Sequence, residues 1–465
     1  MQRLLAIALL TVRAAFRYRL VVVMGVLLIG GVVALPIIIK DDGTARGFTQ
    51  IVLTYTLALI TALLGFVTVW LGCGTLAKEV EEAQLQMVAV KPVARWEIWA
   101  GKWLGIMTLN ALLLGVSAGA VFLLMQWKAR HLSPQQQQVL WTEVLVARRS
   151  AREPMPDYKG YAEKLLQDRL KQMAAQNQPV TNIAALRGYA QQRVKSEYET
   201  IRPDSGQEWT IDLSRVMYSL RDVPMHIRVK FNVAMENLSN TYPGVFEIGD
   251  PADGAHRVWR SEEMSLAADT YHEIAIPANL FNARGQLKVR FFNLSNTAIL
   301  VPLEDGMEAL YRTGGFLGNF VRGVGIIFCW LGFLAALGLM SASFLSFNVA
   351  AFFALGVLLV GLSSGTLKQI VEEGGITGVN HESGYTENPN IIDKIAVPVA
   401  QGMLRLLGMI KDFSPIDSLS SGRTVGWDEL GRAVLQIWVV MAGLLAAIGI
   451  ITFNRRELAT AQGNS

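Results

Sequence analysis

Six apolar stretches, each about as long as a membrane is thick, constrain the fold of this chain more than any other feature. A hydrocarbon core of about 30 Å needs roughly 20 apolar residues in a helix, because only helices and closed barrels satisfy their own backbone hydrogen bonds there. We expect six transmembrane helices at residues 20–39, 48–71, 103–125, 320–340, 344–363 and 433–453. With 52% hydrophobic and 17% charged residues, a wholly soluble or disordered chain is excluded.

The positions of the basic residues predict how these helices are oriented. Residues 1–19 contain four arginines and no acidic residue, and Arg455 and Arg456 follow the last apolar stretch. Because lysine and arginine are concentrated in cytoplasmic segments, we expect both termini in the cytoplasm, which agrees with an even number of spans. Residues 20–125 then hold the first three helices with a cytoplasmic loop at 73–102, and residues 320–363 hold the next two. The last helix and a cytoplasmic tail occupy residues 431–465.

Residues 1–19 allow two interpretations. Their apolar side chains recur at helical spacing, while Arg13 and Arg17 fall mainly on the other face. This pattern is typical of an amphipathic helix that lies in the membrane interface. The alternative is a lead-in to the first span that only supplies the positive charge for orientation.

The abruptly polar segment 126–319 predicts a large extracytoplasmic α+β insert between helices three and four. In its helical part, residues 133–202, Ser133-Pro134 provides an N-cap and a first-turn proline, and apolar residues repeat every three or four positions. In its β-rich part, residues 208–303, apolar and polar residues alternate, most clearly from Met225 to Val233. We expect strands at 225–233, 245–248, 272–276, 286–292 and 298–303, and a small β-sandwich.

A second outer loop is predicted at residues 364–430. It begins with Gly- and Asn-rich turns, and residues 391–410 carry a hydrophobic stripe that predicts an amphipathic helix on the membrane surface or dipping into it. Five basic residues in this loop weigh against an outer location.

The sequence argues against several classes of function. Two cysteines and five histidines are too few and too scattered for a disulfide framework, a metal centre or a catalytic constellation, and a net charge of +4 is too mild for a nucleic-acid binder. Gly101-Lys102 is followed by Trp103, so it is not a phosphate-binding loop. No Asp, Glu, Lys, Arg or His lies inside the six apolar cores, Arg322 and Arg432 being at their edges, whereas ion-coupled carriers usually need such groups at mid-depth. We therefore expect no enzyme activity, metal or cofactor in this chain, and energy for transport has to come from another protein.

The cytoplasmic loop 73–102 is the most informative segment. It leaves the membrane as an acidic helix with Glu79, Glu81 and Glu82, reaches Lys91-Pro92, and re-enters the membrane through Gly101-Lys102. Pro92 fixes its own φ and restricts the preceding residue, so the turn is stiff. A stiff helical hairpin can transmit force between a soluble partner and the spans. The alternative is a plain loop whose charges keep it in water.

This segment resembles the corresponding part of the ABC-2 type permeases, the membrane subunits of a class of ABC transporters. In that family an acidic segment after the second span leads to a Lys-Pro pair, an arginine matched here by Arg95, and a Gly-Lys at the third span. The closing Phe453-Asn454-Arg455-Arg456-Glu457 also resembles the family's C-terminal pattern. The resemblance covers the membrane part of the chain, whereas the insert 126–319 departs from the compact permeases.

The resemblance implies a mechanism in which two permease chains, identical or different, sit on two cytoplasmic ATPase subunits. The segment from Glu79 to Glu97 would act as a coupling helix that converts closure of the ATPases into movement of the spans. The residues implied in this coupling are Glu79, Glu81, Glu82, Leu85, Met87, Lys91, Pro92, Arg95, Glu97, Gly101 and Lys102.

The function expected from these observations is that of a permease subunit of an ATP-driven exporter in a bacterial inner membrane, with an outer domain that receives substrate or binds a protein partner. The alternative is a membrane-anchored extracytoplasmic binding or assembly protein without transport activity. An ion-driven secondary carrier is a weaker third reading. The identity of the substrate does not follow from the sequence.

Overall fold

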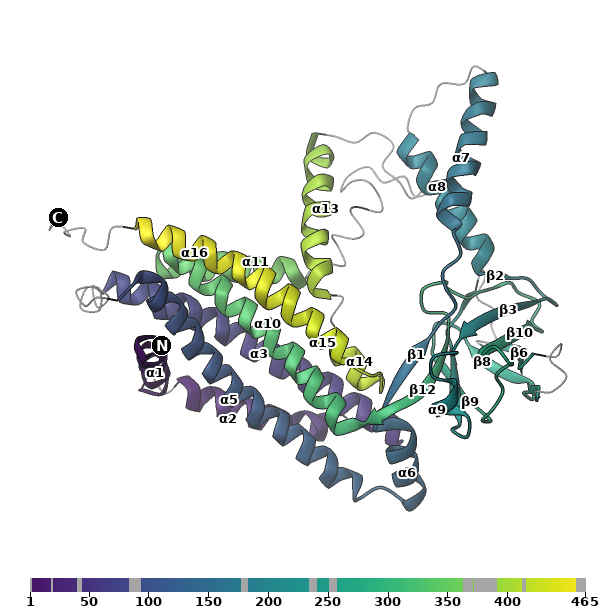
Figure 1. Ribbon diagram of the computed structural model, residues 1–465, viewed down its shortest axis with the longest axis horizontal. Coiled ribbons are helices and arrows are strands. Elements are labelled where there is room, and N and C mark those ends of the chain that lie inside the picture. Colours follow the sequence, from purple (N-terminus) through teal and green to yellow (C-terminus); the bar gives the residue numbers. More distant parts are fainter. Residues whose placement is uncertain are drawn as a thin grey trace. The chain divides into compact units, whose positions relative to one another are not determined.

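The structure is a computed structural model of the 465-residue chain. It describes residues 2–17, 20–39, 44–82, 93–176, 183–233, 241–250, 257–362, 371, 391–411 and 415–456. The chain forms two compact units (Figure 1). The membrane unit comprises Met1–Ala147 and Gly314–Ser465, and the insert unit comprises Arg148–Thr313.

Four helical segments of the membrane unit are long and apolar enough to cross a membrane. They are Ile51–Glu81 within α3 (Ala45–Glu81), α5 (Arg95–Ala129), α10 (Phe316–Phe344), and Trp427–Arg455, which joins α15 (Trp427–Ala433), the π-helical η2 (Val434–Ala442) and α16 (Gly443–Arg455). Each of the four coincides with one predicted apolar stretch. Four of the six predicted spans therefore have helices of sufficient length.

The other two predicted spans are helical but shorter. Helix α2 (Leu20–Ile38) qualifies as a span only together with α1 (Gln2–Arg17), and the two helices are bent by 69° relative to each other. Helix α11 (Phe347–Leu362) has 16 residues, and at 1.5 Å per residue it extends about 24 Å, less than a hydrocarbon core of about 30 Å. A sixfold crossing of the membrane stays a prediction.

Helix α10 is the central helix of the membrane unit, and most of its apolar window is buried (Figure 1). It crosses α3 at two glycines. A Cβ atom on Gly338 would lie 2.9 Å from the carbonyl oxygen of Val69 and 3.0 Å from the Cα atom of Gly72. Small residues at such crossings allow two backbones to approach closely, which is how helices gain packing contacts in lipid.

Two tryptophans tie neighbouring helices to α10. The indole nitrogen of Trp103 on α5 donates to the carbonyl oxygen of Gly332, and that of Trp438 on η2 donates to the carbonyl oxygen of Cys329, both at 3.0 Å. The two rings meet edge to face with centroids 5.6 Å apart. Because an indole N–H needs an acceptor when it is buried, these bonds fix both rings on the central helix.

The turn between α10 and α11 differs from the prediction. The predicted spans 320–340 and 344–363 leave residues 341–343 for this turn, but α10 continues to Phe344 and the next helix begins at Phe347. Ser341 and Ser343 stay helical because their hydroxyls donate to the carbonyl oxygens of Leu337 and Leu339, both at 2.8 Å. Polar residues that satisfy themselves within a helix need not mark its end.

The end of the second predicted loop packs on the membrane unit. Helix α13 (Ile391–Lys411) covers the predicted amphipathic helix, and α14 (Pro415–Ser420) follows it. Leu419 of α14 is buried against Gly323. The side chain of Asn319 accepts from the amide of Val425 at 2.6 Å and donates to the carbonyl oxygen of Arg423 at 2.7 Å.

The insert unit begins later than predicted. Residues 126–147 belong to the membrane unit: α5 continues to Ala129, and α6 (Pro134–Val139) and η1 (Leu140–Val144) follow. Leu140, Val144 and Leu145 are buried in the core of the membrane unit. Apolar residues beyond the end of a span therefore keep this segment with the bundle.

Antiparallel strands and three helices make up the described part of the insert unit. The helices are α7 (Tyr158–Ala175), α8 (Ile183–Glu199) and the short α9 (Met217–Leu220). The strands are β1 (Val146–Ala151), β2 (Thr200–Ile201), β3 (Gly206–Asp212), β4 (Met225–Val229), β5 (Asn232–Val233), β6 (Thr241–Ile248), β7 (Trp259–Arg260), β8 (Met264–Ala267), β9 (His272–Ile276), β10 (Gln286–Asn293), β11 (Ile299–Leu300) and β12 (Met307–Gly315).

These strands form three sheets with the orders β1-β12-β4-β9, β3-β10-β6-β7 and β2-β11-β5, and β8 pairs with β6. Residues of all three sheets contribute to one apolar core that includes Phe231, Phe246 and Phe291. Along β10 the burial alternates residue by residue, as expected for a strand with one face on a core.

Three features of the insert unit differ from the prediction. The strand predicted at 225–233 is divided, because β4 pairs with β9 and β12 whereas β5 pairs with β11 in another sheet. Strand β1 lies in the part that was predicted to be helical, and β12 lies beyond the predicted strands. In the chain, β1 follows the first part of the membrane unit and β12 leads into its second part. The two strands are neighbours in one sheet.

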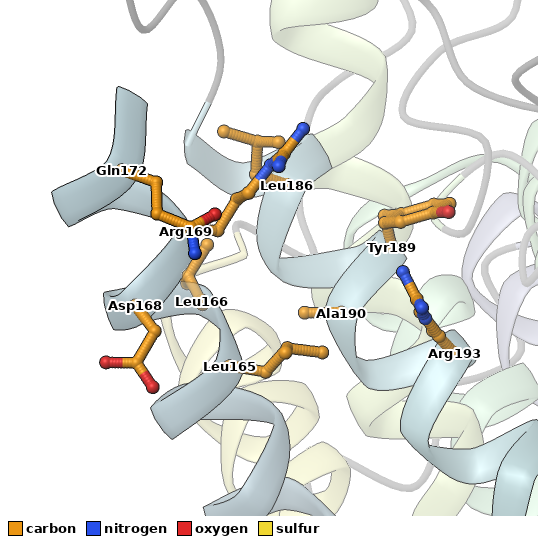
Figure 2. Close-up of a pocket in the computed structure, with 9 residues that line it drawn as sticks. All are labelled: Leu165, Leu166, Asp168, Arg169, Gln172, Leu186, Tyr189, Ala190 and Arg193. Carbon is orange, nitrogen blue, oxygen red and sulfur yellow. The ribbon is translucent and has the colours of Figure 1, made fainter. Parts of the chain in front are cut away.

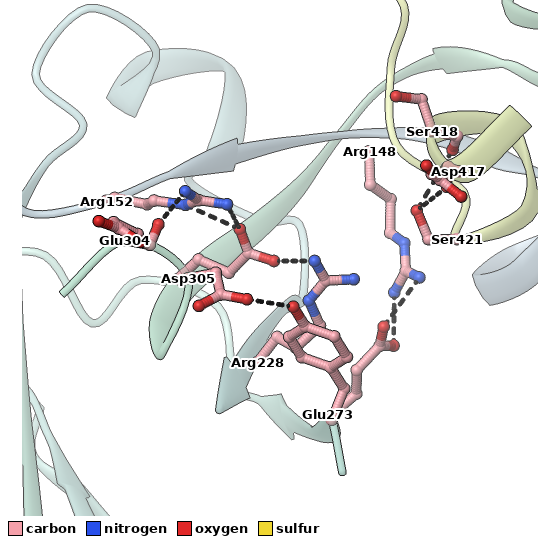
Figure 3. Close-up of polar contacts among 11 residues, drawn as sticks. Arg148, Arg152, Arg228, Glu273, Glu304, Asp305, Asp417, Ser418 and Ser421 are labelled. Atoms are coloured by element: carbon pink, nitrogen blue, oxygen red, sulfur yellow. Dashed lines mark hydrogen bonds and ion pairs between the residues drawn. The ribbon is translucent and has the colours of Figure 1, made fainter. Parts of the chain in front are cut away.

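A row of paired charges runs across the sheet of β1, β12, β4 and β9 (Figure 3). Glu308 on β12 is buried and pairs with Arg228 and, at 3.0 Å, with Arg152. Arg148 on β1 makes two bonds to Glu273 on β9, at 2.8 and 3.2 Å. A buried charge is tolerated because each has an opposite partner at hydrogen-bonding distance.

Tyr271 adds an aromatic ring to this row. The guanidinium of Arg228 lies 4.5 Å from the ring centroid, and the hydroxyl donates to a carboxylate oxygen of Asp305 at 2.6 Å. Burial, and then the hydrogen bond to Asp305, raise the pKa of the Tyr271 hydroxyl to about 12. The hydroxyl is therefore protonated throughout the neutral range and holds the Asp305 carboxylate.

Candidate functional site

The predicted coupling segment falls partly within the described residues. Helix α3 continues past the apolar stretch to Glu81, and α5 begins at Arg95. Leu85, Met87, Lys91 and Pro92 lie between them, outside the described residues. The structure therefore places the other seven predicted residues, which are Glu79, Glu81, Glu82, Arg95, Glu97, Gly101 and Lys102.

Glu79 and Lys102 form an ion pair between α3 and α5. The ammonium nitrogen of Lys102 lies 2.7 Å from a carboxylate oxygen of Glu79 and donates to the carbonyl oxygen of Thr75, also at 2.7 Å. The Lys102 side chain is 4% exposed and the Glu79 side chain 35%. Glu79 thus neutralises the buried ammonium of Lys102 within the same chain. Its carboxylate is therefore already paired.

Glu81 and Lys78 hold the start of α11. A carboxylate oxygen of Glu81 accepts from the amide of Phe347 at 2.8 Å, and Phe347 is the first residue of α11. The ammonium of Lys78 lies 4.5 Å from the Phe347 ring centroid. A carboxylate at a helix N-terminus satisfies an amide that has no partner in the helix and complements the helix dipole.

Arg95 holds the end of the last membrane helix. Its Nη1 donates to the carbonyl oxygens of Phe453, Asn454 and Arg456 at 2.5, 3.0 and 2.8 Å. Its guanidinium lies 5.7 Å from the ring centroid of Phe453, which is fully buried. A cation at a helix C-terminus satisfies carbonyl groups that the helix leaves unpaired.

Arg456 holds the end of α10 in the same way. Its Nη1 donates to the carbonyl oxygens of Ala342 and Ser343 at 3.0 and 3.4 Å and lies 3.5 Å from that of Leu345. Arg456 was expected to mark the cytoplasmic side and to belong to the C-terminal pattern, and it was not among the predicted site residues. Two observations could have identified Arg456 as a capping residue. It belongs to an arginine pair after the last span, and helix ends leave carbonyl groups that need a donor.

The remaining predicted residues act within single helices or against α1. The carboxylate of Glu97 accepts from the amide of Ala94 at 3.0 Å, which caps the start of α5. Glu82 is the exposed C-cap residue of α3. A Cβ atom on Gly101 would lie 2.8 Å from the Cβ atom of Ile7, and one on Gly105 would lie 2.8 Å from the carbonyl oxygen of Ala8. Helix α1 therefore packs against α5 at these two glycines.

The packing of α1 fits the interfacial interpretation. Its small residues Ala8, Thr11 and Ala15 are buried, whereas Leu5 and Leu9 are exposed. An amphipathic helix in a membrane interface needs its large apolar side chains free for lipid. The glycine pair on α5 accepts the small face and leaves the large face outward.

We call Glu79, Glu81, Arg95, Lys102 and Arg456 the capping cluster. Through it the last turn of α3 and the first turns of α5 are connected to the ends of α10, α11 and α16. Within the described residues no three His, Cys, Asp or Glu side chains form a group that could hold a metal ion. The arrangement suits mechanical connection between helices, since every charge in it is satisfied by another group of the chain.

Arg95→Gln is expected to loosen the end of the last membrane helix. The variant loses a cation that satisfies three carbonyl groups, and hydrogen bonds to charged groups contribute about 1.5–3 kcal/mol. We expect a loss of about 1.5 kcal/mol in the free energy of unfolding, because Arg95 is only half-buried. Thermal unfolding of the purified protein in detergent measures it. Arg95→Lys restores part of the loss if charge matters, and equal stability of Arg95→Gln and the parent chain would contradict the capping role.

Comparison of the sequence with models of known protein families gives no match, and comparison with curated protein sequences gives none either.

Proposed function

We propose that this chain is the membrane permease subunit of an ATP-driven ABC exporter whose ATPase is a separate cytoplasmic protein. Two such chains, or this chain and a related one, would form the membrane part, with both termini in the cytoplasm of a bacterial inner membrane. The insert unit would then lie on the outer side. The proposal rests on the resemblance of the loop and C-terminal motifs, on the membrane-crossing length of four helices, and on the absence of a phosphate-binding loop from the sequence.

The capping cluster is the observation that carries the proposal. Residues 83–92 leave α3 just beyond Glu79 and Glu81 and return just before Arg95. Both ends of this short segment are therefore fixed to residues that hold the ends of two other helices, α11 and α16. Arg95 also binds the carbonyl oxygen of Arg456, which holds the end of α10. A partner that displaced the segment would act on α3, α5, α10, α11 and α16 together. That is the mechanical property a coupling segment needs.

Copurification with an ATPase subunit tests the proposal, and the structure indicates which residues to change. Charge reversal at Glu79 or Glu81 would disturb the fold, because both acids have structural partners. The informative variant is Leu85→Asp combined with Met87→Asp, which changes two large apolar residues of the predicted coupling segment between α3 and α5. We expect at least a tenfold loss of copurified ATPase, with unchanged thermal stability of the permease.

A matched control is Glu197→Lys, an exposed acid on α8 of the insert unit, which should leave the amount of ATPase unchanged. Full retention of the ATPase by the loop variant would contradict coupling through this segment. If the parent chain brings down no ATPase from its own membranes, the proposal fails and the anchored binding protein becomes the better account.

A further inference from the structure

Helices α7 and α8 of the insert unit enclose an open groove of about 480 Å³ (Figure 2). Leu166 and Ala190 are buried at its floor. Leu165 and Tyr189 flank them, and Arg169 and Arg193 lie toward the rim. These residues repeat at spacings of three and four along both helices, so each helix presents one continuous face to the groove.

The two helices bury little apolar surface between themselves. Their shared core consists of Ala162, Leu166 and Ala190, with three partly buried neighbours. Leu165 is 41% exposed and Tyr189 62%. A helix pair usually buries a continuous apolar stripe against other elements, and here part of that stripe is left uncovered at the groove.

Two arginines, Arg169 and Arg193, and one acid, Asp168, line the groove. The guanidinium groups of Arg169 and Arg193 make no ion pair within the described residues. Nearby charges of the same helices are paired, since Arg187 lies 3.0 Å from Glu163 and Lys171 lies 3.7 Å from Asp168. The groove therefore offers two available cations beside an apolar floor.

The shape of the groove decides what kind of ligand it fits. Pockets for small molecules enclose most of the ligand surface, but here the wall residues Leu165 and Tyr189 are largely exposed. An open trough between two helices instead fits a third helix, whose apolar residues at positions i, i+3, i+4 and i+7 enter the trough. Tyrosine and arginine are also the residue types that contribute most to protein interfaces.

We propose that the α7–α8 groove binds an amphipathic helix of another protein that carries carboxylates along one edge. Its apolar side chains cover Leu165, Leu166 and Tyr189, and its carboxylates pair with Arg169 and Arg193. The complex is a three-helix arrangement that completes the apolar face of the pair. This interaction does not depend on the ATPase or on the transport activity proposed above.

Photo-cross-linking in the cells that produce the protein tests this inference. The full chain carries p-benzoylphenylalanine in place of Tyr189, and the adduct is identified by mass spectrometry of the cross-linked peptide. We expect the peptide to come from a second protein and to form an amphipathic helix with acidic residues on one edge. Arg169→Glu combined with Arg193→Glu should lower the adduct yield at least tenfold, and Lys substitution of the facing acids in the partner should restore it.

Two controls keep the result specific. The photo-reactive residue placed at Tyr218, an exposed position on α9 outside the groove, should not give the same adduct. Lys164→Glu, a charge reversal on α7 outside the groove, should leave the yield unchanged. The inference is overturned by an adduct with lipid, by an adduct with a second copy of this chain, by no adduct, or by a yield that charge reversal at Arg169 and Arg193 does not change.

Discussion

Glu79→Gln is expected to destabilise the membrane unit by about 3 kcal/mol, because it leaves the ammonium of Lys102 buried without its counter-charge. This is the lower end of the range for a broken buried ion pair, since a third of the Glu79 side chain is exposed. Thermal and denaturant unfolding of the purified protein in detergent measure the loss.

The double variant Glu79→Gln with Lys102→Met tests whether the loss comes from an unpaired buried charge. Removing both charges leaves no unpaired ion and keeps the apolar stem, so its stability should return to within about 1 kcal/mol of the parent chain. Glu197→Gln, at an exposed position of α8, serves as the control with little effect. Equal destabilisation by the single and double variants would show that the two charges do not depend on each other.

Gly338→Ala is expected to have the next largest effect, a loss of about 2 kcal/mol. The added methyl group would meet the Val69 carbonyl oxygen at 2.9 Å and the Gly72 Cα atom at 3.0 Å. Both are backbone atoms that cannot turn aside, so α3 and α10 must move apart, and overpacking of this kind costs about 1–3 kcal/mol.

Gly318→Ala provides the matched control, because it is the same substitution in the same helix at a position with no atom within 4 Å of the added Cβ. Alanine favours the helix over glycine by about 0.5–1 kcal/mol, so this variant should be as stable as the parent or slightly more stable. The melting temperatures of the two variants in detergent should therefore lie on opposite sides of the parent value. Similar values for both would contradict the close crossing of α3 and α10.

The sequence predicted the apolar helices well because hydropathy reports burial in lipid directly. The helix ends were less predictable. Helix α3 extends to Glu81, beyond the predicted end of its span at Leu71, where an acidic helix was expected. What could not be predicted is that Lys78 and Glu79 contact α11 and α5. Pairing between segments distant in the chain has no local sequence signal.

The strands of the insert unit were predictable where one face of the strand is exposed to solvent. Strand β10 alternates in burial and was found within one residue of its predicted bounds. Strand β12 was missed, because its residues Met307–Tyr311 are all buried and include the charged Glu308. In the sequence alone, Glu308 favours a loop, because its ion pairs with Arg228 and Arg152 have no local signal.

The position of the candidate site was predictable, whereas the partners of its residues were not. The motifs around Arg95 and Gly101-Lys102 pointed to the end of the bundle where the capping cluster lies. The internal roles of Glu79 and Glu81 were not predictable, since a sequence shows that an acid is near a membrane end but not which amide or ammonium it meets. The α7–α8 groove had no signal beyond the helical repeat of its apolar residues.

The side of the membrane on which residues 83–92 lie decides whether a cytoplasmic ATPase can reach the proposed coupling segment. The two native cysteines, Cys73 and Cys329, are buried, so a cysteine introduced at Gln84 becomes the main site for a membrane-impermeant maleimide. We expect no labelling at this position in intact cells and full labelling after the inner membrane is opened. Labelling in intact cells would place the segment outside the cytoplasm, beyond the reach of any ATPase, and would contradict the proposed coupling.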